Sequence, residues 1–406
     1  MGIALASAVV LSACGGGSSG NDAQSGSAAG TLDPGFGSGG AVLTSNSSVA
    51  HGIALQPDGK IVVAAGNSVF RYTPNGVLDA TFGTGGAVSG ALGTGEFASF
   101  RVALQPDGLI VAAGSFTRTA GGGAYHCALV RYMADGATDR GFGDDGMVVW
   151  DPNGNVSACT DVALQPDRQI VVGVQPGSVP LLGGLTARFR SDGTPDPTFG
   201  VNGSVYGGGS IALQPDLKIL AAWILRGHGL DECDLGRVDA AGVSDPGFGN
   251  GGSVQWKGPF DDQAPLACAM ARQPDGKIVV VNEGSVARFL DNGTLDPGFG
   301  TGGVVTGIPG VAVAVQSNGK IVVAGGAGNI SPPNGFALWR LGVDGRLDPG
   351  FGIAGSVTTS LLDKGGAEAV AIQSDGKILA AGWAESRPAG GTPAPSTAAL
   401  ARYFGD

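Results

Sequence analysis

Residues 295–304 read Leu-Asp-Pro-Gly-Phe-Gly-Thr-Gly-Gly-Val, and close variants of this phrase occur seven times along the 406-residue chain. The phenylalanines of successive copies are 46 to 60 residues apart. A period of about fifty residues is typical of repeated supersecondary units. The repeated phenylalanines are Phe36, Phe82, Phe142, Phe199, Phe248, Phe299 and Phe351.

A second phrase, Gln-Pro-Asp-Gly, separates two short apolar runs in each unit. Proline presets φ at the second turn position, aspartate bonds back to the backbone and glycine accepts a positive φ, so each copy predicts a hairpin. Two copies lose the glycine, at Arg168 and Leu217, and the last two read Gln-Ser-Asn-Gly and Gln-Ser-Asp-Gly. The phrases begin at Gln56, Gln105, Gln165, Gln214, Gln273, Gln316 and Gln373.

Charged residues recur at a fixed separation. An arginine near the end of each of the first six units is followed eight residues later by an aspartate, which predicts one repeated structural ion pair. Arg402 has no aspartate after it and Asp33 has no arginine before it, so these two complete the set if the chain ends meet. We assign these pairs no catalytic role. The pairs are Arg71 with Asp79, Arg131 with Asp139, Arg188 with Asp196, Arg237 with Asp245, Arg288 with Asp296, Arg340 with Asp348, and Arg402 with Asp33.

These repeats predict an all-β fold. Each unit has room for four short strands, glycine is abundant at 76 residues, and no helical apolar stripe is evident. We expect residues 31–406 to form a seven-bladed β-propeller, closed into a ring of four-stranded antiparallel blades. Two forms of closure stay open. Either residues 41–44 pair with strands near Ile378 and Leu400, or each unit is a whole blade and closure depends on side-chain packing and on the pair of Arg402 with Asp33.

The repeated phrases resemble those of the delta-60 repeat β-propeller family of bacteria. Its units read much like Gln-Pro-Asp-Gly-Lys-Ile-Val-Val-Ala-Gly, then Arg-Tyr, then Leu-Asp-Xaa-Xaa-Phe-Gly, and the resemblance runs from about residue 31 to residue 403. It implies the propeller fold. The family is largely without assigned activity, so the resemblance implies no catalytic residue.

The first thirty residues differ in composition from the repeats. The apolar run 3–10 leads into Leu11-Ser12-Ala13-Cys14, which resembles a bacterial lipobox, and residues 14–30 are rich in glycine and serine. We expect a signal peptide at residues 1–13, a lipid on Cys14 and a flexible tether at residues 14–30. Because Gly15 follows the cysteine, we expect an outer-membrane lipoprotein of a Gram-negative bacterium. The alternatives are an ordinary secretory signal or a merely apolar start. No Lys or Arg precedes the run, which departs from the usual n-region of a signal peptide.

Four further cysteines fall into two equivalent pairs. Cys127 and Cys233 each precede the arginine of their unit by four residues, and Cys159 and Cys268 precede the next repeated glutamine by six and five. In an exported protein this pattern predicts the disulfides Cys127–Cys159 and Cys233–Cys268. A four-thiolate metal site is the alternative, but no Cys-Xaa-Xaa-Cys spacing occurs.

Composition and spacing argue against several functions. A net charge of −11 with only 23 Lys and Arg disfavours nucleic acid or an anionic membrane surface as a partner. His51, His126 and His228 are isolated, and residues 151–155 resemble only the first half of a calcium loop, so we expect a turn there. We therefore predict no metal site and no cofactor.

The connections between strands vary most from unit to unit, and they carry or border Trp150, Trp256 and Trp383. We expect a monomeric, non-enzymatic binding or scaffold module that uses these loops to bind an envelope protein or a glycan and meets the membrane only through its lipid anchor. The rival interpretation is an envelope hydrolase or lyase with an acidic site at the channel mouth; a purely structural surface protein is a third. The candidate acids are Asp144, Asp145, Asp261 and Asp262.

Overall fold

The computed structural model describes residues 28–45, 47–89, 91–92, 95–117, 124–151, 154, 156–176, 183–225, 232–258, 268–327, 333–387 and 394–406. Cys14 and the predicted signal peptide lie outside these residues. Within the described part the chain forms 27 strands and no helix. Consequently no helix there could cross a membrane.

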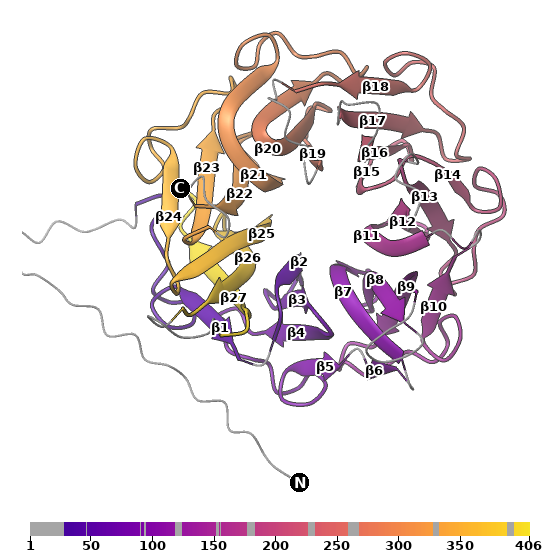
Figure 1. Ribbon diagram of the computed structural model, residues 1–406, viewed down its shortest axis with the longest axis horizontal. Helices are drawn as coiled ribbons and strands as arrows, with labels where there is room; N and C mark the ends of the chain where they lie inside the picture. The colour runs from indigo at the N-terminus through magenta and orange to yellow at the C-terminus, as the bar shows by residue number, and fades with distance from the viewer. Residues whose placement is uncertain are drawn as a thin grey trace, which may run out of the picture.

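The strands form antiparallel sheets that stand side by side around a common axis (Figure 1). Among the described residues four sheets have four strands, one has five and one has six. This confirms the predicted all-β architecture of four-stranded antiparallel sheets. The strands of the first four sheets in chain order are β2 (Ala50–Leu55), β3 (Ile61–Ala65), β4 (Ser68–Tyr72), β5 (Ala87–Ser89), β6 (Ala91–Leu92), β7 (Gly95–Leu104), β8 (Ile110–Thr117), β9 (His126–Tyr132), β10 (Met147–Trp150), β11 (Val156–Leu164), β12 (Ile170–Pro176), β13 (Leu185–Phe189), β14 (Ser204–Tyr206), β15 (Ser210–Leu213), β16 (Ile219–Leu225), β17 (Glu232–Val238) and β18 (Ser253–Trp256).

The six-stranded sheet contains two repeat units because two of its strands are long. The 12-residue β20 pairs with β19 at residues 278–281 and with β21 at residues 283–287. β21 in turn pairs with β22 at residues 310–315. The remaining strands are β19 (Ala269–Arg272), β20 (Ile278–Phe289), β21 (Val304–Val315), β22 (Ile321–Gly326), β23 (Phe336–Leu341), β24 (Ser356–Thr359), β25 (Lys364–Ile372), β26 (Ile378–Glu385), β27 (Thr397–Tyr403) and β1 (Ala41–Thr44).

The last sheet is built from both ends of the described chain. Its order is β1-β27-β26-β25, and Ala41 pairs with Ala401 while Thr44 pairs with Ala398. Of the two arrangements that the sequence left open for residues 41–44, the structure shows the one in which they pair with the strand that contains Leu400.

The turn next to this sheet is also formed by residues from both ends of the described chain. The Gly30 amide donates to the Phe404 carbonyl at 2.8 Å and the Phe404 amide donates to the Thr31 carbonyl at 2.9 Å. In the first unit, one continuous turn makes the equivalent bonds between Thr73 and residues 76–77. Residues 28–30, which we assigned to the tether, thus take the place of a turn segment.

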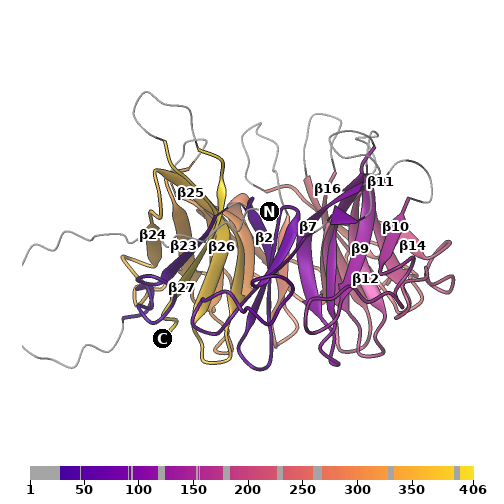
Figure 2. The ribbon, with the colours of Figure 1, turned by 90° about the horizontal axis from the view of Figure 1, so that it is seen from below.

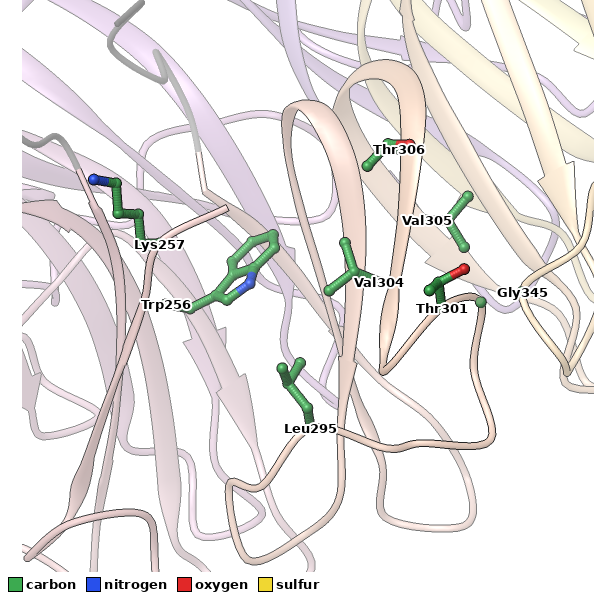
Figure 3. A pocket seen from close by; sticks show the side chains of 9 residues that line it. Trp256, Lys257, Leu295, Thr301, Val304, Val305, Thr306 and Gly345 are labelled. Carbon is green, nitrogen blue, oxygen red and sulfur yellow. The ribbon is translucent and has the colours of Figure 1, made fainter. Parts of the chain in front are cut away.

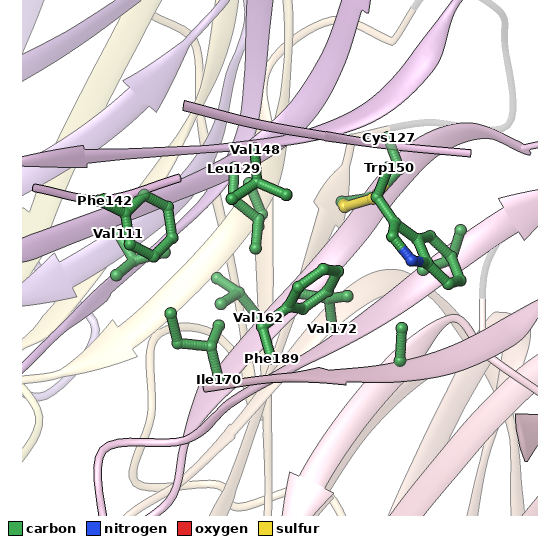
Figure 4. Packing of buried hydrophobic residues seen from close by; sticks show 14 residues of the cluster. Val111, Cys127, Leu129, Phe142, Val148, Trp150, Val162, Ile170, Val172 and Phe189 are labelled. Atoms are coloured by element: carbon green, nitrogen blue, oxygen red, sulfur yellow. A yellow bond between two sulfur atoms is a disulfide. The ribbon is translucent and has the colours of Figure 1, made fainter. Parts of the chain in front are cut away.

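The hydrophobic core lies mainly in the seams, by which we mean the interfaces between neighbouring sheets. All seven repeated phenylalanines are fully buried. One cluster joins Val111 and Leu129 of one sheet to Val172 and Phe189 of the next (Figure 4). Each sheet therefore buries its faces against two neighbours, as expected where no unit can bury its apolar faces alone.

Two hairpin turns carry a side chain where the others have glycine. Arg168 and Leu217 have φ values of 69° and 67°, and the glycine at the same position in the next unit, Gly276, has a φ of 93°. This left-handed region costs a residue with a Cβ atom about 1–2 kcal/mol. The chain accepts that cost in two consecutive units.

We expect Leu217→Gly to raise the free energy of unfolding by about 0.5–1 kcal/mol, since relief of the strain exceeds the entropy that glycine gains in the unfolded chain. Urea titration measures this. Gly276→Leu is the matched control and should destabilise by a similar amount, because a Cβ atom there would make only ordinary van der Waals contacts, the nearest with Arg272 Nη2 at 3.6 Å. A destabilised Leu217→Gly variant would contradict the strain argument.

Candidate functional site

The repeated Arg and Asp side chains meet in every unit. Their closest nitrogen and oxygen atoms are 2.7–2.9 Å apart in all seven pairs, including Arg402 with Asp33, which come from opposite ends of the chain. Each guanidinium also lies 4.4–4.8 Å from the ring centre of a repeated phenylalanine. The charged pair and the aromatic ring thus form one buried unit.

Each of these arginines also joins two repeat units. Its Nη1 donates to a backbone carbonyl in a turn of the next repeat unit, which for Arg288 belongs to the same six-stranded sheet. The arginines therefore hold unit to unit, and they are already occupied by protein groups. The acceptors are Ala134 for Arg71, Ser191 for Arg131, Ala240 for Arg188, Asp291 for Arg237, Val343 for Arg288, Gly405 for Arg340 and Pro74 for Arg402.

In six of the pairs the pKa of the aspartate is lowered, which holds the carboxylate in the charged form. Burial alone would raise the pKa of Asp79, but hydrogen bonds from Thr81 and Lys60 and the charge of Arg71 lower that pKa below its usual range. A carboxylate with such a low pKa is a poor proton carrier near neutral pH. These residues are scaffold, as their repetition in every unit already suggests.

The cysteines join two seams. Cys127 in β9 is bonded to Cys159 in β11, with Cα atoms 4.6 Å apart, and Cys233 in β17 is bonded to Cys268 before β19, with Cα atoms 6.1 Å apart. Both predicted pairings are thus present. Each bridge ties one sheet to the innermost strand of the next.

A buried tryptophan backs each disulfide. Trp150 lies opposite Cys127 across β9 and β10, and Trp256 lies opposite Cys233 across β17 and β18. The two indoles are 6% and 5% exposed and pack edge to face on phenylalanine rings 5.9 and 6.0 Å away. Figure 4 shows Trp150 and Phe189 of the first pair. Both are buried core residues, although Trp256 also lines a groove; Trp383 is half-buried.

A charged cluster lies on the innermost strands, near the axis. The Arg101 Nε is 4.0 Å from Asp161 Oδ1, and its Nη1 donates to the His51 carbonyl. The Asp161 carboxylate accepts the backbone amides of Val162 at 2.9 Å and Ile211 at 2.8 Å. The cluster therefore links β2, β7, β11 and β15, the inner strands of four neighbouring sheets.

The protonation states of His51 and Asp161 fit a role in joining the inner strands. Burial, helped by the charge of Arg101, lowers the pKa of His51 to about 4, so the ring is neutral at pH 7. Burial raises the pKa of Asp161, while Arg101 and the backbone amides oppose that shift. Each carboxylate oxygen of Asp161 accepts a backbone amide, so this side chain joins β11 to β15.

The sequence reading missed this cluster, although a signal for it exists. The inner strands can be compared at one position, the residue four positions before the repeated glutamine. In five units a β-bulge lies just before it. Aligned on the glutamine, one column holds polar side chains in three consecutive units. Its members are Gly52, Arg101, Asp161, Ser210, Ala269, Ala312 and Ala369.

The acids of the rival enzymatic interpretation do not converge. Asp144 and Asp145 are exposed in the turn before β10, the outermost strand of its sheet, and Asp145 lies 3.5 Å from Arg140. Asp261 and Asp262 lie outside the described residues. The structure thus places the first two at the outer edge and not at the channel mouth.

The other chemical candidates do not form a metal site where the chain is described. His126 Nδ1 is 3.0 Å from Asp151 Oδ2, and the described residues contain no group of three or more His, Cys, Asp or Glu that could hold a metal ion. His228 and most of the calcium-like segment 151–155 lie outside the described residues.

One groove opens between the outer strands of two sheets (Figure 3). It has a volume of about 730 Å³ and lies between Trp256 and Lys257 at the end of β18 and Val304 and Thr306 of β21, with Leu295 at one end. The walls are mixed apolar and polar, with one lysine. Such a groove can accept a side chain or a small ligand, but it gathers no acid–base pair.

A family model supports the propeller fold. Six segments match a β-propeller domain of unknown function (DUF5122), at residues 56–82, 105–142, 165–199, 273–299, 316–351 and 373–404. The unit that begins at Gln214 lies outside these matches. No curated protein matches the chain.

Solved structures of similar shape are distant in sequence. The extracellular domain of a hybrid two-component system from B. thetaiotaomicron is 12% identical, with a TM-score of 0.49, and the match covers 88% of this chain and 39% of that one. The chain thus spans about two fifths of that protein. A protein of unknown function from Dyadobacter fermentans is 13% identical over 90% of this chain and 98% of that one, with a TM-score of 0.46. Drosophila Semaphorin 1a, extracellular domains 1-2, is 10% identical over 90% and 87%, with a TM-score of 0.48.

Proposed function

We propose that this β-propeller repeat chain is a seven-bladed propeller closed into a ring, which serves as a non-enzymatic binding or scaffold module. Closure is supported by contacts between the two ends of the chain. Arg402 pairs with Asp33 and its Nη1 donates to Pro74 of the first unit, while β1 pairs with β27. The equivalent contacts of the repeated arginine, with its aspartate and with a backbone carbonyl, recur in the other units.

One observation supports the non-enzymatic role: the recurring charged groups form salt bridges and hydrogen bonds that join strands and neighbouring units. Each repeated arginine binds its own aspartate and a neighbouring turn, and the cluster of Arg101 and Asp161 links inner strands. What differs between units is the connection between the second and third strands. It is two residues long between β3 and β4 and eight residues long between β8 and β9. Loops of variable length on a rigid scaffold are typical binding elements.

The proposed location is the cell envelope. Two disulfides favour an oxidising compartment and therefore export. The lipobox-like residues around Cys14 and the following Gly/Ser-rich segment support a lipid anchor in the outer membrane. The module acts there as a monomer, and its partner is an envelope protein or a glycan.

In-cell cross-linking followed by mass spectrometry tests this proposal. Cys14→Ser removes the anchor, and a second variant replaces residues 118–125 by Gly-Asn, as at residues 66–67. We expect one envelope partner captured by the parent chain and lost from the first variant; the second should lose it if this connection forms the contact. Absence of a partner for the parent, together with no binding to envelope glycans, would contradict the proposed role.

A further inference from the structure

Asp234 is a buried carboxylate in the seam between the β11–β14 sheet and the β15–β18 sheet. Its side chain belongs to β17, the residue is 6% exposed, and Oδ1 has no hydrogen-bond partner in the described structure. Three residues before the repeated arginine, most other units have a small side chain and none has an acid. Those residues are Ser68, Ala128, Leu185, Ser285, Ala337 and Ala399.

An aromatic wall stands beside this carboxylate. Trp223 lies directly opposite Asp234 across β16 and β17, is 7% exposed, and has an Nε1 without a partner among the described residues. Its indole packs edge to face on Tyr206, with ring centres 6.1 Å apart. Tyr206 is 54% exposed, so the wall extends from the buried carboxylate to solvent.

The backbone around the indole is shaped for it. A Cβ atom on Gly207 would lie 2.6 Å from the Trp223 ring, and one on Gly236 would lie 3.0 Å from it. Gly183, whose amide donates to the Tyr206 hydroxyl at 3.0 Å, lies against Nε1. The glycines fix the position of Trp223 beside Asp234. On the outer side, the strand partner of Asp234 is the exposed Gln255.

Among the described residues, none forms a salt bridge with the Asp234 carboxylate or donates to its Oδ1. Burial, helped by the charge of Glu232 on the same strand, raises the pKa of Asp234 to about 6. The groups that face it from neighbouring strands, Trp223, Tyr206 and Gln255, bring no positive charge. The nearest base along β18, Lys257, lines the groove in the next seam. A buried carboxylate without a counter-ion is costly, and a bound cation removes the cost.

We propose that this seam binds an organic cation, an ammonium or guanidinium group that donates to Asp234 Oδ1 and lies against the rings of Trp223 and Tyr206. Carboxylates and aromatic rings together are the groups that recognise such cations. The cation can belong to a free amine or to a Lys or Arg side chain of another protein. Asp234 lies in the unit that the family model does not match. The proposal does not depend on export or on the loops.

Thermal unfolding of the full chain with ethylguanidinium as the probe tests the site. At pH 8 and matched ionic strength, a saturating millimolar concentration should raise the melting temperature by about 2 °C or more, since the ligand binds only the folded state. Asp234→Asn should abolish the shift, and Asp144→Asn, an exposed acid in the turn before β10, should leave it unchanged. At pH 5 the shift should shrink in the parent, because Asp234 is then mostly protonated. An equal shift in parent and Asp234→Asn, or no shift in either, would overturn the proposal.

The stability of the unliganded variant provides a second readout. Because the folded pKa of Asp234 lies above its unfolded value, the parent loses stability as the pH rises from about 4 past 6. Asp234→Asn should lack this loss and melt higher than the parent at pH 8. A lower melting temperature would show that the carboxylate already has a counter-ion in its own chain, which would overturn the inference.

A final comparison distinguishes the sources of the cation. Tryptophan fluorescence of the parent can be titrated with butylammonium and with a capped tripeptide that has a central arginine. Tighter binding of the tripeptide indicates a protein side chain, and tighter binding of the amine indicates a free small molecule. Failure of both probes to change the fluorescence, with Trp223→Phe as the reference, would overturn the proposal.

Discussion

Arg402→Ala is expected to lower the free energy of unfolding by about 3 kcal/mol or more, the usual cost of removing one partner of a buried ion pair. The variant leaves Asp33, which is 5% exposed, with only Lys377 at 3.2 Å as a counter-ion. It also leaves the Pro74 carbonyl without its donor and removes the cation from the Phe36 ring. Urea denaturation followed by circular dichroism measures the loss.

Arg288→Ala is the matched control, because the same contacts occur there inside the chain. Arg288 binds Asp296, donates to the Val343 carbonyl and lies over Phe299, and Lys277 remains near Asp296 at 3.6 Å. Both variants should lose a similar free energy. Only Arg402→Ala should also speed amide exchange in β1. A parent-like melting temperature for Arg402→Ala would contradict a buried pair that joins the chain ends.

The second large effect concerns the disulfides. Replacing both Cys127 and Cys159 by alanine should lower the free energy of unfolding by about 3 kcal/mol, and the same change at Cys233 and Cys268 should do likewise. The bridges close loops with sequence separations of 32 and 35 residues, and closing a loop of this size restricts the unfolded chain by about that amount. Alanine is preferred to serine because Cys127, Cys159 and Cys233 are fully buried in apolar seams.

Two controls accompany the disulfide variants. Reduction of the parent should reproduce the destabilisation of the four-cysteine variant, and reductant should leave that variant unchanged. Peptide mapping without reductant should recover the two bridges. Four free thiols, or exchanged pairs, would refute the assignment.

Much of the scaffold is predictable because the repeats encode it several times. The fixed spacing between arginine and aspartate is informative because the same ion pair recurs in units whose other residues vary. Arg402 and Asp33 have no partner at that spacing in the sequence, so they indicate where the chain ends meet. The cysteine offsets are similarly informative, because two equivalent pairs make the same connection in different seams.

The division of the repeat into sheets could not be predicted. A repeated sequence has the same period wherever it is cut, so the phrase around Phe36 alone does not reveal that β1 joins the sheet of β25–β27. The length of β20 and β21, which joins two units in one sheet, depends on pairing that the sequence does not state.

Contacts across seams were equally hidden. Trp150 and Trp256 could be surface or core by sequence, and their burial follows from the phenylalanine of the neighbouring sheet. The cluster of Arg101 and Asp161 needs the β-bulges that bring inner strands together. Asp234 occurs once, in one unit, so no repeated pattern points to it.

The most direct test is amide hydrogen exchange of β1 in the full chain, with β5 as the internal reference. Both are short outer strands of four-stranded sheets. β5 pairs with β4, which precedes it along the chain, whereas β1 pairs with β27 from the opposite end of the chain. If the two ends complete one sheet of a closed propeller, Ala41–Thr44 should be protected as well as Ala87–Ser89. Exchange of Ala41–Thr44 at the rate of an unstructured peptide, while Ala87–Ser89 stays protected, would contradict closure by the chain ends.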